Sequence, residues 1–257
     1  MTAIFDTHAH YDDKAFDEDR KQLLISLPAQ GIGRVVNVGS SLDSCKTTLE
    51  LTDSYDHIYG AIGIHPSDTA ELTEGDMDWL QTHCSHGKCV AVGEIGLDYY
   101  WDEPERELQK KWFVRQLELA RQVKKPVIIH SREAARDTAD ILMAEHAGEI
   151  GGVIHCYSYT KETAKTYLDM GFFFGIGGVL TFKNARKLKE AVEYIPMDRI
   201  VLETDSPYLA PVPNRGKRNT SLNLPYVVTA MAQMKGLDEE EIRRITWDNA
   251  LRLYHMD

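Results

Sequence analysis

Short apolar runs rich in β-branched residues alternate along the chain with longer stretches whose apolar residues recur at helical spacing. The runs predicted as strands cover residues 4–6, 34–38, 58–64, 90–94, 127–130, 153–155, 172–175 and 200–203. Residues 105–123, 161–170 and 185–194 lie between strands and place their apolar side chains on one helix face. Short strands that alternate with helices indicate βαβ units, and therefore an α/β protein with a parallel sheet.

Eight strand–helix units in a chain of 257 residues predict a (β/α)8 TIM barrel that forms a single domain over residues 1–257. An open doubly wound sheet is the alternative, but it would leave most of the chemical motifs described below on separate edges. Two additional C-terminal helices are predicted near 225–235 and 239–254, and we expect them to plug or flank the barrel. The loop before them, 207–223, is rich in Pro, Arg and Asn.

Composition and charge limit the class of protein. The hydrophobic fraction of 43% suffices for a packed core. The sequence contains no run of about 18 apolar residues, so we expect no membrane span. The N-terminus lacks the features of a signal peptide and the four cysteines show no paired framework, so we expect a cytoplasmic protein. The net charge of −11 argues against a protein that coats duplex nucleic acid, but it allows a nuclease that engages one strand end through metals.

Metal-ligating side chains occur at the ends of the predicted strands. Asp6, His8 and His10 alternate along the first strand, so we expect them to project toward one point. Two imidazoles and a carboxylate are typical of half a site for zinc or another divalent cation. Active sites of (β/α)8 barrels are built at the carboxyl ends of the strands. The candidate residues at those ends are His8, His10, His65, Glu94, His130, His155 and Asp205.

These ligands exceed what one ion needs, because a catalytic zinc takes about four ligands and keeps one position for water. The predicted metal ligands are His8, His10, Glu94, His130, His155 and Asp205, a set that suits two divalent cations such as Mg²⁺, Mn²⁺ or Zn²⁺. Glu94 is the expected bridge between the ions because a carboxylate has two oxygens. Such a pair of ions would polarise a phosphoryl or carbonyl oxygen and lower the pKa of a shared water. For any single histidine, the alternative is a hydrogen-bonded core residue.

Three of these residues are predicted to take part in catalysis. Asp205 is expected to serve as ligand and proton acceptor, and Glu94 as the bridging ligand. His65 is expected to contact the substrate phosphate or the attacking water, with a helix-capping role as the alternative. Asp6 is ambiguous between ligation and orienting a ligand histidine. For Glu203, a buried salt bridge or support of a ligand histidine is favoured over direct ligation.

A negatively charged substrate also needs cations from the protein. The predicted substrate-binding residues are Arg132, Arg215, Lys217 and Arg218, each with a solvated surface position as its alternative. Tyr99, Tyr100 and Trp101 suit either stacking on bases or packing at the base of a loop. A separate zinc site in residues 83–89 is disfavoured, because adjacent His83 and Cys84 do not easily chelate one ion together.

Seven segments resemble the TatD family of metal-dependent deoxyribonucleases, a branch of the amidohydrolase superfamily of (β/α)8 barrels. They are DTHAHYD (6–12), GIHP (63–66), GEIGLDYY (93–100), KPVIIHSREA (125–134), HCYS (155–158), ETDSPYLAP (203–211) and RGKRN (215–219), in the order usual for the family. The resemblance places the family's metal ligands at the six residues named above, with Glu94 shared between the ions. Three residues in two loops depart from the family pattern: Thr220 and Ser221 replace an acidic residue and a proline, and Tyr159 replaces a glycine.

The resemblance implies a metal-dependent deoxyribonuclease that cleaves phosphodiester bonds with a metal-activated water. We expect a 3′–5′ exonuclease-like activity on single-stranded or end-exposed DNA, with no membrane association and no obligate protein partner. One alternative keeps the metals and hydrolyses a small amide, lactone or aminoacyl ester. Another is a non-catalytic binding protein that has kept a metal site, which is disfavoured because every ligand position is filled.

Overall fold

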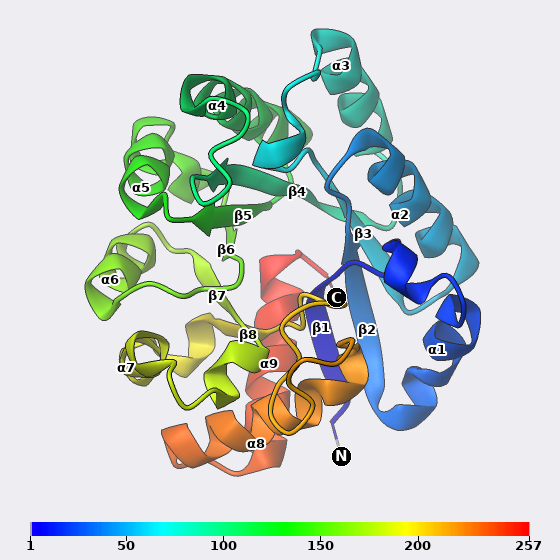
Figure 1. Ribbon diagram of the computed structural model, residues 1–257, viewed down its shortest axis with the longest axis vertical. Helices are drawn as coiled ribbons and strands as arrows, with labels where there is room; N and C mark the ends of the chain where they lie inside the picture. Colours follow the sequence, from blue (N-terminus) through cyan, green and yellow to red (C-terminus); the bar gives the residue numbers. More distant parts are fainter. Residues whose placement is uncertain (1, 257) are drawn as a thin grey trace.

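A computed structural model describes residues 2–256 and shows eight parallel strands, hydrogen-bonded in chain order around one axis (Figure 1). The strands are β1 (Ile4–Ala9), β2 (Ile32–Val38), β3 (Ile58–Ile62), β4 (Cys89–Asp98), β5 (Val127–Arg132), β6 (Gly152–Ile154), β7 (Phe173–Ile176) and β8 (Ile200–Leu202). The helices are α1 (Arg20–Ser26), α2 (Leu42–Ser54), α3 (Glu74–His83), α4 (Arg106–Val123), α5 (Ala135–Ala144), α6 (Lys161–Asp169), α7 (Arg186–Tyr194), α8 (Leu224–Lys235) and α9 (Glu239–Leu253). Helices α1 to α7 surround the strands (Figure 1).

The ends of β1 and β8 meet and close the barrel. Ala9 forms a parallel bridge with Ser206, whose carbonyl accepts the N–H of His10 at 2.7 Å. The carbonyl of His8 accepts the N–H of Asp205 at 2.9 Å. These bonds confirm the predicted (β/α)8 barrel and rule out the open doubly wound sheet.

Alternation along the strands separates two apolar layers. Ile129 belongs to the larger buried cluster, which includes the helix side chains that cover the barrel, whereas Ile128 and Val153 belong to a second cluster. His130 and His155 lie two residues beyond Ile128 and Val153, so they share the face of that second cluster. The period of the strands therefore directs both histidines toward the interior of the barrel.

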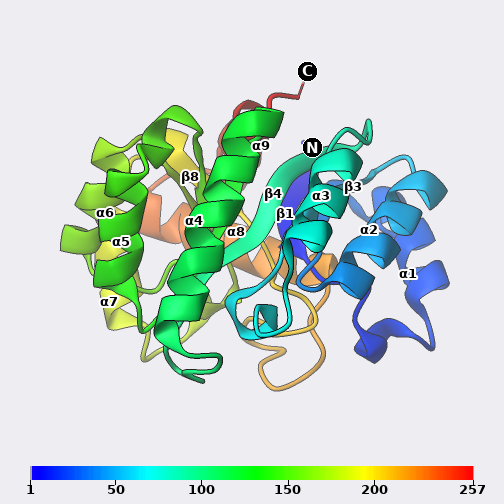
Figure 2. The same cartoon turned by 90° about the horizontal axis from the view of Figure 1, so that it is seen from above.

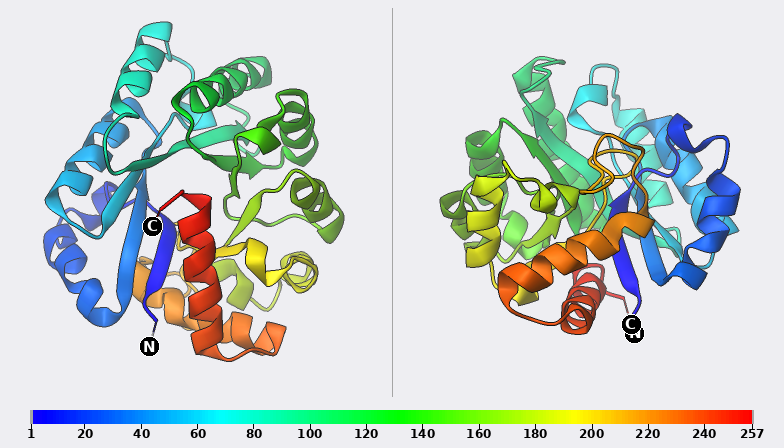
Figure 3. Two further views of the ribbon diagram at one scale, coloured as in Figure 1. Left: turned by 180° about the vertical axis from the view of Figure 1, so that it is seen from behind. Right: turned by 60° about the horizontal axis from the view of Figure 1, so that its bottom comes forward.

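Helix α9 packs against this interior cluster from the end opposite the strand carboxyl termini. Ala250, Leu253 and the following Tyr254 are members of the cluster, and the Tyr254 hydroxyl donates to the carbonyl of Thr7 at 2.8 Å. Seen from behind, α9 lies across the strands (Figure 3), while the loop 207–223 lies on the other side of the molecule (Figure 2). Both predicted C-terminal helices are present, and α9 has the expected plugging position. Among residues 2–256, none of the helices combines the length and apolar character that a membrane crossing requires.

Strand β4 departs furthest from its predicted bounds, because it continues four residues past Glu94 to Asp98. Ile95 and Leu97 stay buried in the larger cluster while the strand remains paired with β5. Gly96 makes this extension possible, since its φ is +145° and a Cβ there would collide with the carbonyl of His130. The longer strand brings a second carboxylate, Asp98, to the same end of the barrel as Glu94.

Candidate active site

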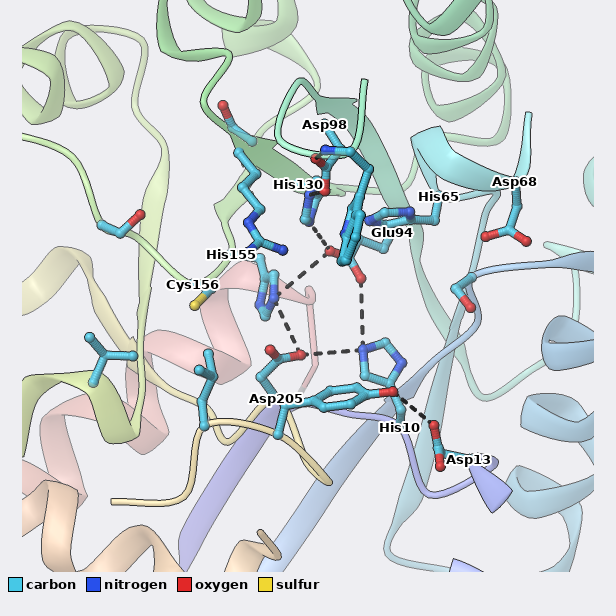
Figure 4. A pocket seen from close by; sticks show the side chains of 18 of the residues that line it. His10, Asp13, His65, Asp68, Glu94, Asp98, His130, His155, Cys156 and Asp205 are labelled. Atoms are coloured by element: carbon cyan, nitrogen blue, oxygen red, sulfur yellow. Dashed lines mark hydrogen bonds and ion pairs between the residues drawn. The ribbon is translucent and has the colours of Figure 1, made fainter. Parts of the chain in front are cut away.

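All six predicted metal ligands meet at the carboxyl ends of the strands, and Figure 4 labels His10, Glu94, His130, His155 and Asp205 among them. Glu94 lies at their centre and presents one oxygen to each of two pairs of histidines. Its Oε2 is 3.4 Å from Nε2 of His8 and 3.7 Å from Nε2 of His10. Its Oε1 is 2.7 Å from Nδ1 of His130 and 3.8 Å from Nε2 of His155. This is the arrangement expected of a carboxylate that bridges two cations.

Asp205 completes the cluster from the turn after β8. Its Oδ1 lies 3.4 Å from Nε2 of His10, 3.6 Å from Nε2 of His155 and 3.9 Å from Nε2 of His8. The backbone of Asp205 is left-handed, with φ of 56°, a conformation that Asp tolerates better than most residues. The hydrogen bond of its N–H to β1 holds the side chain over the cluster.

The donor set fits divalent cations. Ligand atoms of His8, His155 and Asp205 lie within 4.8 Å of one another, as do those of His8, His10 and Glu94. Imidazole nitrogens and carboxylate oxygens are the ligands that zinc and related transition metals accept. Since Glu94 faces both pairs of histidines, the side chains present suit a pair of cations.

Hydrogen-bond acceptors orient two of these histidines from behind. Nδ1 of His10 lies 2.8 Å from the carbonyl oxygen of Val38, and Nδ1 of His155 lies 3.1 Å from Oε2 of Glu203. An acceptor at Nδ1 keeps the proton there and leaves the Nε2 lone pair facing the cluster. Glu203 fits in this position because Gly175 on β7 has no Cβ to collide with its carboxylate. Glu203 therefore holds the ring of His155, a predicted ligand, through this hydrogen bond.

We expect Glu203→Gln to weaken divalent-cation binding by about 10–100-fold, the usual effect of losing such an outer carboxylate. The Glu203 carboxylate accepts bonds from both His155 and the N–H of Cys156, the latter at 2.6 Å, and a carboxamide has only one accepting oxygen. Competition with a chromophoric chelator measures the affinity, and the exposed Glu190→Gln is the matched control. An affinity equal to that of the unmodified protein would contradict this role.

Carboxylates and imidazoles in the cluster shift each other's pKa. Burial lowers the pKa of His155, but Glu203, Glu94 and Asp205 outweigh it and raise the pKa to about 10. Burial is likewise outweighed at His10, where Asp205 and Glu94 raise the pKa to about 9. Burial raises the pKa of Glu94, yet its histidine neighbours hold that pKa well below its usual value. Ligation requires unprotonated rings, so cation binding here is coupled to proton release.

The position of His65 allows both the helix-capping role and the substrate-contacting role that the sequence left open. Its Nδ1 accepts the N–H of Ser67 at 3.2 Å and so caps the short helix Pro66–Asp68. Its ring also lines the cavity and lies edge-on to His130, with 4.3 Å between ring centroids. Burial, followed by the charge of His130, lowers the pKa of His65 to about 3. The ring is therefore neutral, and with Nδ1 accepting, its Nε2 carries the proton as a hydrogen-bond donor.

A cavity of about 750 Å³ opens over the cluster. Its lining carboxylates are Asp12, Asp13, Asp68, Glu94, Asp98 and Asp205. Among the described residues that line it, Arg132 is the one Lys or Arg. An anionic substrate would meet a repulsive field in this cavity unless cations neutralise the carboxylates.

The aromatic segment after β4 divides between packing and exposure. Tyr99 donates its hydroxyl to Asp137 at 2.7 Å and is partly buried. Tyr100 and Trp101 are exposed, and Trp101 lines the cavity. The guanidinium of Arg132 lies 3.8 Å from the centroid of the Tyr100 ring. Arg132 and two of the three aromatic residues therefore lie where a substrate could contact them.

Arg215, Lys217 and Arg218 form a cationic loop that lies further from the cluster than Arg132 does. Arg215 lies over the ring of Phe182 at 4.3 Å, and neither Arg215 nor Lys217 lines the cavity. Arg218 donates to both carboxylate oxygens of Asp19, at 2.7 and 2.6 Å. Arg218 therefore fastens the loop to the segment before α1, a contact that spacing in the sequence does not reveal.

Ser221 and Tyr159, which depart from the family pattern, each form hydrogen bonds near the site. Ser221 donates its hydroxyl to Oδ2 of Asp6 at 2.6 Å, and the same oxygen accepts the Thr204 hydroxyl at 2.7 Å. Asp6 therefore joins β1, β8 and the loop rather than orienting a histidine ring. The hydroxyl of Tyr159 lies 3.1 Å from Oγ of Ser131, at the end of β5. Both substitutions thus contribute polar bonds to the walls of the site.

Residues 83–89 do not gather a metal-binding group within the part of the chain that the structure describes. Nδ1 of His83 bonds to the carbonyl of Trp79, and Nε2 of His86 lies 3.0 Å from Oδ1 of Asp53. Cys84 and Cys89 are buried.

Asp98 is a candidate functional residue that the sequence prediction missed. It lies on the same face of β4 as Glu94, four residues on, and Oδ2 is 3.0 Å from Nε2 of His130. Side chains four residues apart on a strand share a face, so the spacing of Glu94 and Asp98 could have predicted this position. The sequence prediction ends the strand at Glu94 and therefore leaves Asp98 out.

Comparison with known proteins agrees with this geometry. Residues 5–255 match the family model described as TatD related DNase. The chain is 42% identical over 254 residues to the uncharacterized metal-dependent hydrolase YabD of Bacillus subtilis, covering 99% of this chain and 100% of the relative. It is 36% identical over 257 residues to the uncharacterized metal-dependent hydrolase YcfH of Escherichia coli, covering 99% and 96%. The crystal structure of the TatD homolog YJJV from Escherichia coli superposes with a TM-score of 0.92 at 28% identity, covering 99% and 98%.

A match over residues 5–255, relatives well above 30% identity and a barrel with candidate metal-binding groups of His, Asp and Glu all confirm the resemblance seen in the sequence. The chain belongs to the TatD related DNase family, and it is a metal-dependent hydrolase.

Proposed function

We propose that this protein is a divalent-metal-dependent deoxyribonuclease that removes nucleotides from an exposed 3′ end of DNA. The observation that carries the proposal is the position of Glu94, which turns one oxygen to His8 and His10 and the other to His130 and His155. The description of the matching family, TatD related DNase, supports DNA as the substrate.

When bound, two divalent cations would polarise a phosphoryl oxygen and lower the pKa of a water between them. The side chains around the cluster supply the remaining functions. Asp205, whose side chain is 18% exposed toward the cavity, accepts the proton of the attacking water. Arg132 binds a phosphate oxygen through its guanidinium. His65 donates from Nε2 to a phosphoryl oxygen as its negative charge develops.

The surroundings of the cavity suit one strand end better than a long duplex. Tyr100, Trp101 and Tyr208 are exposed, and Trp101 and Tyr208 line the cavity, where a base could stack. Arg215 and Lys217 lie further out and would contact the strand beyond the terminal nucleotide. The net charge of −11 favours short contact over extended wrapping. We further propose that residues 1–257 form a single catalytic domain that works in the cytoplasm without an obligate protein partner.

Hydrolysis of end-labelled single-stranded oligonucleotides with Mg²⁺, Mn²⁺ or Zn²⁺ tests this function. A strand labelled at its 5′ end should shorten stepwise, and a strand labelled at its 3′ end should release labelled mononucleotide first. No cleavage with any of these metals, together with turnover of a carboxylic ester or amide, would overturn the substrate class.

We expect Arg132→Ala to lower kcat/KM for a phosphodiester by about 10–100-fold, since a hydrogen bond to a charged group contributes about 1.5–3 kcal/mol. Arg132 is the one Lys or Arg among the described residues lining the cavity, so no neighbouring cation replaces it there. The matched control is Arg136→Ala on α5, whose side chain is exposed and pairs with Asp140. Equal kcat/KM for the Arg132 variant and the unmodified protein would contradict the assignment.

A second candidate function is the hydrolysis of a small amide, lactone or aminoacyl ester. The placement of Arg215 and Lys217 outside the cavity favours it, because a neutral substrate needs no cationic loop. Arg132→Ala separates the two functions, since it should leave turnover of a neutral substrate nearly unchanged. Tight cation binding without turnover of any substrate would instead indicate a binding protein.

A further inference from the structure

Asp98 lies on the far side of the His130 ring from Glu94. Its side chain is buried, and its Oδ2 is 3.0 Å from Nε2 of His130, while Nδ1 of the same ring is 2.7 Å from Oε1 of Glu94. The other oxygen, Oδ1, accepts the N–H groups of Tyr100 at 2.9 Å and Trp101 at 3.2 Å. One carboxylate thus holds both the imidazole of a predicted ligand and the aromatic segment beside the cavity.

This contact decides which nitrogen of His130 keeps its proton when a cation binds the ring. An ionised carboxylate accepts hydrogen bonds only, so the nitrogen that faces Asp98 must be the donor. Nδ1 faces the Glu94 carboxylate in the same way, so both nitrogens donate when no cation is bound; once a cation beside Glu94 takes the Nδ1 lone pair, the remaining proton lies on Nε2. The orientation is opposite to that of His10 and His155, whose acceptors lie at Nδ1.

We propose that Asp98 is a positioning residue that keeps the proton of His130 on Nε2 and thereby presents Nδ1 to a cation beside Glu94. The carboxylate also fixes the start of the segment 99–101 through its other oxygen. The inference rests on the metal site of the proposed function, but not on DNA as the substrate.

A third cation held by His65, Asp98 and His130 is the competing interpretation, because their ligand atoms lie within 4.8 Å of one another. Two contacts argue against it. Nδ1 of His65 accepts the N–H of Ser67, so its remaining nitrogen carries a proton when the ring is neutral. Asp98 and Nε2 of His130 already satisfy each other at 3.0 Å.

Asp98→Asn provides a sharp test because it keeps the shape of the side chain and reverses one contact. The amide oxygen can still accept the backbone N–H groups of Tyr100 and Trp101. The amide nitrogen then faces Nε2 of His130 as a donor, which favours the tautomer with the proton on Nδ1. That proton would occupy the nitrogen needed for ligation.

The experiment has two readouts, neither of which uses a substrate. Zn²⁺ affinity is measured by competition with a chromophoric chelator, and the tautomer of His130 by long-range ¹⁵N NMR of the Zn²⁺-loaded protein. We expect Asp98→Asn to weaken Zn²⁺ binding by about 10–100-fold. In the Zn²⁺-loaded unmodified protein we expect the proton of His130 on Nε2.

The control is Asp53→Asn, which makes the same change in an Asp–His pair of equal 3.0 Å separation on the surface, and should leave Zn²⁺ affinity unchanged. Unchanged affinity in a folded Asp98→Asn protein, a proton on Nδ1 of His130 in the Zn²⁺-loaded unmodified protein, or a third Zn²⁺ at Asp98 would each overturn the inference. The NMR result needs no variant, so it decides the question even if Asp98→Asn does not fold. Unmodified protein that binds Zn²⁺ but cleaves no DNA refutes the nuclease and leaves this inference standing.

Discussion

Glu94→Ala is expected to abolish hydrolysis of every substrate and to remove most of the bound metal. Each carboxylate oxygen of Glu94 faces a different pair of histidines, so one substitution takes a ligand from both positions. We expect kcat to fall by at least about 10³-fold, because the charge stabilisation of both cations is lost together. Elemental analysis after dialysis, run beside a panel of phosphodiester and ester substrates, measures both effects.

The exposed Glu190→Ala on α7 serves as the control for this substitution, because Glu190 pairs with Arg186 on the surface, on a helix that holds none of the six ligands. It should keep the metal content and activity of the unmodified protein. A Glu94→Ala protein that retained two cations, or that lost one hydrolytic activity and kept another, would show that Glu94 does not bridge.

Asp205→Asn is expected to separate chemistry from metal binding. A carboxamide oxygen still ligates a cation but does not accept a proton from water at neutral pH. We expect kcat to fall by about 10²–10⁴-fold, the range for losing a general base, while most of the metal is retained. Single-turnover rates and metal content, measured on the same sample, check this result.

Asp140→Asn on α5 is the matched control for Asp205, since it removes an exposed carboxylate that pairs with Arg136. Loss of metal in proportion to activity in Asp205→Asn would mean that Asp205 acts as a ligand only. Full activity would remove it from the mechanism. Compared with Glu94→Ala, the variant thus assigns the two carboxylates to different functions.

Strand periodicity accounts for most of what could be predicted from the sequence. Residues two apart on a strand share a face, so His130 and His155 could be placed inside the barrel from Ile128 and Val153 alone. The order of the strands then brings ligands from distant segments to one end. Residues 225–235 and 239–254 were likewise close to the observed α8 and α9.

Contacts between loops were beyond this kind of prediction. Arg215, Lys217 and Arg218 are neighbours in the sequence, yet Arg218 binds Asp19 and the other two lie outside the cavity lining. Asp6 alternates with His8 and His10, but its carboxylate bonds to Thr204 and Ser221 across the seam of the barrel. The direction of such side chains depends on partners far away in the chain.

The full length of β4 also escaped prediction, and with it Asp98. An extended strand past Glu94 depends on Gly96, whose positive φ and close approach to the His130 carbonyl are tertiary features. The apolar residues Ile95 and Leu97 carry the alternation onward, so the signal was present in the sequence without a clear boundary.

Anomalous diffraction from crystals soaked in Mn²⁺ tests the central claim most directly, because it locates cations without reference to any substrate. The account predicts two peaks about 3.5–4 Å apart on either side of the Glu94 carboxylate. One should lie beside His8 and His10, and the other beside His130 and His155. A single peak, or peaks away from Glu94, would contradict it.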